Sequence, residues 1–123
     1  MSLLIHLVSI QKLVAQTLRE QIQEADSLSR FSHTHLADSI YEDILANAKK
    51  EGDAQLQFEI LTKLAKNRSL YFQFKAIQTY LDQAEAVLKS GTSFEPKLLG
   101  QYYYIQGHVL HNRSQYRASN EYL

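Results

Sequence analysis

Apolar residues recur every three or four positions through most of this chain, which is the spacing that one buried face of an α-helix requires. The pattern is unbroken from Leu3 to Leu28, and no glycine or proline occurs before Gly52. No segment shows the strict apolar–polar alternation of a half-buried strand. The spacing therefore predicts an all-α fold in which each helix packs one face against its neighbours.

Lapses in the pattern divide the chain into six predicted helices. The second and the fourth end at Gly52 and Gly91, because glycine readily closes a helix. The only proline, Pro96, is placed to open a fifth helix, since the first helical turn needs no N–H there. A turn near residues 112–114 is predicted to separate the fifth helix from a sixth.

An internal repeat groups these helices into pairs. Three residues recur 39 positions later, Ala37, Tyr41 and Gly52 as Ala76, Tyr80 and Gly91. Six recur 42 positions later, Leu61, Ala65, Phe74, Ala76, Tyr80 and Leu81 as Tyr103, Gly107, Tyr116, Ala118, Tyr122 and Leu123. Small residues such as Ala65 and Gly107 are expected where two helices cross closely. The repeat predicts a single domain of three units, about residues 1–52, 53–91 and 92–123.

The last unit carries the spacing of a tetratricopeptide (TPR) motif, W-x2-L-G-x2-Y on a first helix and A-x3-F on a second. The matching residues are Tyr103, Gln106, Gly107, Leu110, Ala118 and Tyr122. Residues 25–123 thus resemble the TPR family in a looser form, although Gln106 and Arg68 replace a usual Leu and a usual aromatic residue. The resemblance implies a right-handed stack of three antiparallel helix pairs with a concave, peptide-binding groove.

The resemblance also implies which residues line that groove. Placing Gly107 against a partner helix sends Tyr103 inward and leaves other residues of the third and fifth helices on the groove face. The candidate binding residues are Glu59, Thr62, Lys66, Tyr104, His108 and His111. An exposed tyrosine beside histidines is a composition that protein interfaces favour, and ordinary solvated surface is the alternative for each residue singly.

The sequence offers no clear catalytic or metal-binding motif. His108 and His111, and likewise His33 and His35, have spacings that can hold a metal, but no Glu-x-x-His accompanies them. Solvent-facing histidines are therefore favoured. No nucleophile elbow or phosphate-binding loop is found. We expect no enzymatic activity, no metal and no cofactor.

Charge and composition limit the classes of partner and the compartment that we expect for this chain. Thirteen Lys and Arg balance thirteen Asp and Glu, so no global field favours nucleic acid or an anionic membrane. The apolar run Leu3–Ile10 lacks the basic residues of a signal peptide and is too short to span a bilayer. The absence of cysteine fits a reducing compartment, so we expect a cytoplasmic protein.

These observations predict a non-catalytic interaction module or scaffold that binds a protein partner, as a peptide or a helix, in its groove. Two alternatives stay open: a regulatory or sensor segment of a bacterial signalling protein, such as a histidine kinase or transcription regulator, and a dimerisation or assembly domain. Apolar crowding at residues 3–8 favours a homodimer through the first helix, and the last helix has no closing glycine. We therefore expect a fragment of a longer array, or self-association at both end helices.

Overall fold

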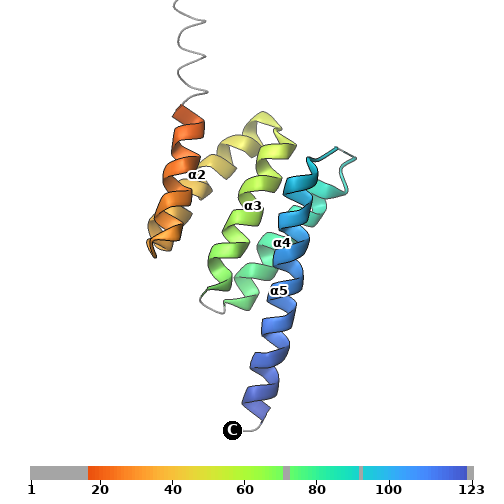
Figure 1. Ribbon diagram of the computed structural model, residues 1–123. Coiled ribbons are helices and arrows are strands. Elements are labelled where there is room, and N and C mark those ends of the chain that lie inside the picture. The colour runs from red at the N-terminus through yellow and green to blue at the C-terminus, as the bar shows by residue number, and fades with distance from the viewer. Residues whose placement is uncertain (1–16, 71–72, 92, 122–123) are drawn as a thin grey trace, which may run out of the picture. The chain divides into compact units, whose positions relative to one another are not determined.

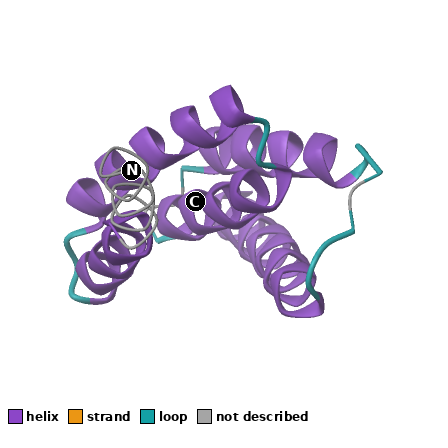
Figure 2. Cartoon of the chain, turned by 90° about the horizontal axis from the view of Figure 1, so that it is seen from above, coloured by secondary structure: helices purple, strands orange, loops and turns teal. Residues whose placement is uncertain are grey.

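The computed structural model describes residues 17–70, 73–91 and 93–121, with side chains through residue 115. All regular secondary structure in these ranges is helical, as Figure 2 shows, which confirms the all-α prediction. No helix in the same ranges is long and apolar enough to cross a membrane. Residues 3–16, with the apolar crowding and the predicted dimerisation surface, lie outside the described residues.

The chain divides into two compact units, residues 1–44 and 45–123. In the first, a helix over residues 17–30 is followed by α2 (Thr34–Glu51), which continues into the second unit. Ser32 makes the turn between them with a left-handed φ of 69°. The Tyr41 hydroxyl donates a hydrogen bond to Asp26 Oδ1 over 2.5 Å, which ties α2 to the preceding helix. The turn comes shortly after Leu28, where the unbroken apolar pattern of the sequence ends.

The second unit is built on α3 (Ala54–Ser69), α4 (Phe74–Leu88) and α5 (Pro96–Glu121). α3 and α4 pack as an antiparallel pair, and α5 lies beside α3 and runs in the same direction (Figure 1). The buried apolar residues of this unit are Leu45, Ala48, Phe58, Ile60, Leu61, Leu64, Ala65, Ile77, Leu81, Ala84, Phe94, Tyr102, Ile105 and Val109. Burial of Ala65 agrees with its predicted place in the helix packing.

The helix ends of this unit follow from local chemistry. Gly52 and Gly91 adopt left-handed φ values of 69° and 90°, a conformation that glycine reaches at little cost. The Asp53 carboxylate caps α3 by accepting a hydrogen bond from the Leu56 N–H over 3.1 Å. The loop before α5 returns Phe94 to the core, where its ring lies 4.8 Å from that of Phe58. Both predicted glycine stops are confirmed.

The predicted break near residues 112–114 is wrong. α5 continues as one helix of 26 residues from Pro96 to Glu121, so residues 115–121 extend the fifth helix and form no antiparallel partner for it. Asn112, Arg113 and Ser114 disfavour helix only weakly, by at most ~0.7 kcal/mol each relative to Ala. No glycine or proline follows Gly107 in the sequence to stop the helix. The described residues therefore contain no third helix pair.

Candidate functional site

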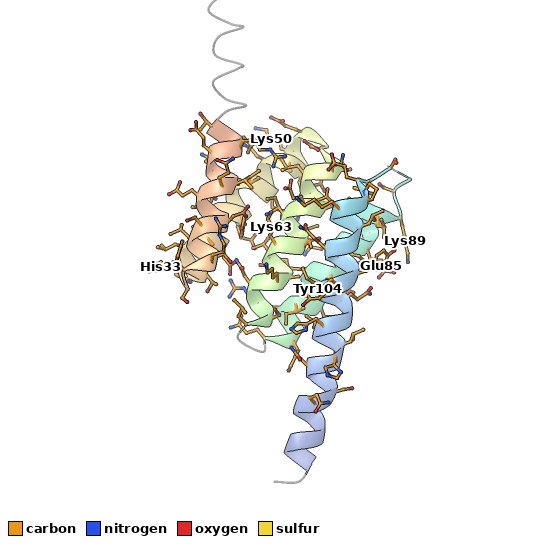
Figure 3. All side chains as sticks on the ribbon, viewed as in Figure 1. His33, Lys50, Lys63, Glu85, Lys89 and Tyr104 are labelled. Carbon is orange, nitrogen blue, oxygen red and sulfur yellow. The ribbon has the colours of Figure 1, made fainter. Side chains whose placement is uncertain are left out.

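A groove of about 520 Å³ lies between α3 and α5. We call it the α3–α5 groove. Its lining residues are Thr62, Lys63, Lys66, Ser69 and Leu70 from α3 and its C-cap, and Lys97, Gly100, Gln101, Tyr104, Ile105 and His108 from α5. Figure 3 labels one residue from each wall, Lys63 on α3 and Tyr104 on α5. On both helices most of these positions are three or four residues apart, so each wall is one continuous helix face.

On the α3 wall, the hydroxyl groups are held by the backbone. Thr62 is only 3% exposed, and its hydroxyl donates to the Phe58 carbonyl oxygen over 2.8 Å. The Ser69 hydroxyl donates in the same way to the Lys66 carbonyl oxygen over 2.6 Å. The side chain of Lys66 is exposed. Lys66 is therefore an exposed charged group on this wall.

On the α5 wall, two rings form an exposed platform. Tyr104 is 71% exposed and stacks on His108, with ring centroids 5.8 Å apart and planes within 5° of parallel. Nδ2 of Asn112 lies 3.1 Å from His108 Nε2. In the neutral tautomer with its proton on Nδ1, His108 accepts this hydrogen bond at Nε2. The histidine is thus supported from two sides, and the tyrosine ring is left facing solvent.

The register of α5 differs by one residue from the prediction. Tyr102 is 2% exposed and shares the buried face with Ile105 and Val109, whereas Tyr103 is 56% exposed. Gly107 is exposed, and a Cβ built on it would meet no atom within 4 Å. Tyr103 therefore does not point inward, and Gly107 is not a close helix crossing. The exposure expected for Tyr104 is found.

A tertiary contact explains this register. The Tyr102 ring lies 5.3 Å from the Phe58 ring, which also contacts Phe94, so three aromatic residues from α3, the loop and α5 form one cluster. Burial raises the pKa of the Tyr102 hydroxyl, and the nearby Glu85 raises this pKa further. The sequence carried a sign of this face, because Tyr102, Ile105 and Val109 have helical spacing and the alternative face includes the polar Gln106.

The structure brings four of the six candidate residues together in the groove, Thr62, Lys66, Tyr104 and His108. Glu59 is half-buried on α3 and His111 is exposed on α5, and neither lines the groove. Sequence reasoning missed Lys63 and Lys97. Each lies one or two helical turns from a predicted residue. Their presence in the same groove depends on the packing of α3 against α5, which the sequence pattern does not give.

Within the described residues, no group of three or more His, Cys, Asp or Glu side chains is arranged to hold a metal ion. His108 contacts Tyr104 and Asn112 as described above. His33 takes part in the turn before α2, where its backbone N–H donates to the Leu28 carbonyl oxygen over 2.8 Å.

Comparison with protein-family models, with curated proteins and with solved structures finds no match for this chain. The resemblance to the TPR family therefore stays a prediction from the sequence.

Proposed function

We propose that this chain is a non-catalytic protein-interaction module whose α3–α5 groove binds a peptide or a helix of a partner protein. The groove itself carries the proposal. Its volume of about 520 Å³ falls within the roughly 300–1,000 Å³ usual for ligand sites. It exposes Tyr104 beside the apolar groups of Leu70 and Ile105, and an accessible aromatic ring next to apolar surface is typical of residues that dominate binding energy.

The resemblance to TPR proteins supports the same faces of α3 and α5 as the binding surface. α3 and α5 correspond to the predicted first helices of two successive units, and in that family the first helices line the concave surface. We include a cytoplasmic setting in the proposal, because a chain without cysteine suits a reducing compartment.

The groove also limits the length of its ligand. Its α5 wall runs from Lys97 to His108. These positions are about 16 Å apart along a helix that rises ~1.5 Å per residue. An extended peptide advances ~3.3 Å per residue, so about five of its residues would span the wall.

Selection from a display library of peptides of about eight residues, followed by affinity measurement on the full chain, tests the proposal. We expect selected peptides to lose about tenfold or more in affinity with Tyr104→Ala, as for a central interface aromatic. Tyr103→Ala is the matched control, because Tyr103 is also exposed and adjoins Tyr104 but does not line the groove. Circular dichroism and melting establish that both variants are folded.

Two results would refute the proposal. One is a selection that enriches no peptide. The other is a set of peptides whose affinity is unaffected by Tyr104→Ala, or falls equally with Tyr103→Ala.

A further inference from the structure

Positive charge is concentrated in the α3–α5 groove, although the chain as a whole is neutral. Lys63, Lys66 and Lys97 line the groove, and none of its described lining residues is Asp or Glu. Over the whole sequence the basic and acidic residues number thirteen each. The local excess therefore comes from the way α3 and α5 are paired. Lys66 and Lys97 stand on opposite walls, and both are exposed.

The two exposed lysines lie at different levels along the groove. α3 and α5 run in the same direction, so later positions of each helix lie toward the same end of the groove (Figure 1). On α5, Lys97 precedes Tyr104 by about two turns and His108 by about three. On α3, Lys66 precedes Leu70 by about one turn. The start of α5 is hydrogen-bonded to the start of α3 through Glu95 and Gln55, so Lys97 lies near one end of the groove. Lys66 is near the end of α3 and therefore lies closer to the level of Tyr104 and His108.

We infer that the occupant of the groove is an acidic peptide segment of a protein, whose Asp or Glu side chains contact the lysines and whose neighbouring apolar side chain contacts Tyr104. The inference rests on the proposed function and adds the chemistry of the partner. A buried lysine–carboxylate contact in such a complex joins opposite charges on the two surfaces, which favours encounter and excludes cationic partners.

The lining residues favour a carboxylate-bearing peptide over the other anions. Lysine is a point charge on a flexible stem and adapts to side-chain carboxylates at several spacings. Arginine, whose planar fork suits phosphate, does not occur among the described lining residues. A chain of zero net charge also lacks the broad positive field that gathers nucleic acid or anionic membranes.

Three synthetic peptide pools of about eight residues test the inference. All three pools share the same apolar positions. At the other positions the acidic pool carries Asp and Glu, the neutral pool carries Asn and Gln, and the cationic pool carries Lys and Arg. We expect the acidic pool to bind the full chain about tenfold or more tightly than the neutral pool in fluorescence anisotropy, and the cationic pool not to bind. The affinity of the acidic pool should fall as salt rises from about 0.05 to about 0.3 M, because salt screens exposed charges.

A charge-reversal variant tests whether the preference for acidic peptides comes from the lysines of the groove. The double variant Lys66→Glu, Lys97→Glu should weaken the acidic pool about tenfold or more and allow the cationic pool to bind. The matched control is Lys50→Glu with Lys75→Glu, two exposed lysines on α2 and α4 that do not line the groove. It changes the net charge equally and should leave both affinities unchanged.

The outcomes separate this inference from the function on which it rests. If neutral peptides bind as tightly as acidic ones and depend on Tyr104, the acidic partner is wrong and the groove function stands. If no pool binds in a Tyr104-dependent way, the groove function fails as well. A labelled oligonucleotide or phosphatidylserine vesicles that bind more tightly than the acidic pool, and lose affinity in the Lys66, Lys97 double variant, would also overturn the inference.

Discussion

Replacing Gly107 with alanine tests the register of α5 through the sign of a stability change. Gly107 lies inside α5, is exposed, and leaves a new Cβ with no atom within 4 Å. The added methyl group therefore gains no contact and meets no clash. Glycine is about 0.8–1.0 kcal/mol less favourable than alanine in a helix interior, mostly because the unfolded chain is more flexible. We expect Gly107→Ala to stabilise the protein by roughly 0.5–1 kcal/mol and to raise Tm by about 2–4 °C.

Two other glycines provide matched controls for this prediction. Gly52 and Gly91 are equally free of neighbours within 4 Å of a Cβ, but they adopt left-handed φ values of 69° and 90°. Alanine in that region costs about 1–2 kcal/mol, so Gly52→Ala and Gly91→Ala should destabilise the protein by that amount. The same chemical change thus has opposite signs at sites that differ in backbone conformation.

Urea unfolding monitored by circular dichroism measures all three variants. A loss of stability with Gly107→Ala would refute the reasoning, because it would show that another surface packs closely against α5 at this position. That outcome would restore the helix crossing predicted from the sequence repeat.

Three further predictions concern the core and the groove. Tyr102→Ala should destabilise the protein by about 3–5 kcal/mol, whereas Tyr104→Ala should change stability by less than ~0.5 kcal/mol, as comparison of their urea midpoints will show. Ala65→Leu should cost about 1–3 kcal/mol by overpacking a fully buried site, and an unchanged melting temperature would contradict that packing. The raised pKa of Tyr102 means that folding favours its neutral phenol, so this stabilisation is complete below about pH 10, the usual value for tyrosine, and is lost as pH rises through the folded-state pKa. Tyr102→Phe should therefore lose less stability than the parent in alkaline urea titrations.

The sequence predicted features that depend on local chemistry. The helical period identified the helices, and the stops at Gly52 and Gly91 followed because a left-handed residue closes a helix regardless of its tertiary setting. The break predicted near residues 112–114 was wrong because Asn, Arg and Ser have only weakly unfavourable helix propensities. Such residues end a helix only where tertiary packing or side-chain hydrogen bonds favour another backbone conformation.

Features that depend on contacts between distant segments were harder to predict. The run Tyr102–Tyr104 offers three consecutive rings for one buried position, and helical geometry alone does not choose among them. The contact of Tyr102 with Phe58 makes that choice. Four residues of the predicted set, Thr62, Lys66, Tyr104 and His108, line the α3–α5 groove, although the register of α5 differs by one residue from the prediction. Lys97 was missed because its position in the groove depends on α5 lying beside α3.

The aromatic cluster has a consequence for the entropy of binding. Phe58 belongs to α3 and Tyr102 to α5, and the ring of Phe94 packs on Phe58 from the loop before α5. These contacts hold together the two helices that form the walls of the groove. The Glu95 N–H adds a hydrogen bond to Gln55 Oε1 over 3.2 Å, which fixes the start of α5 to the start of α3. A ligand that enters between walls already fixed in this way loses less free energy to ordering the protein, so more of its contact energy is retained as affinity.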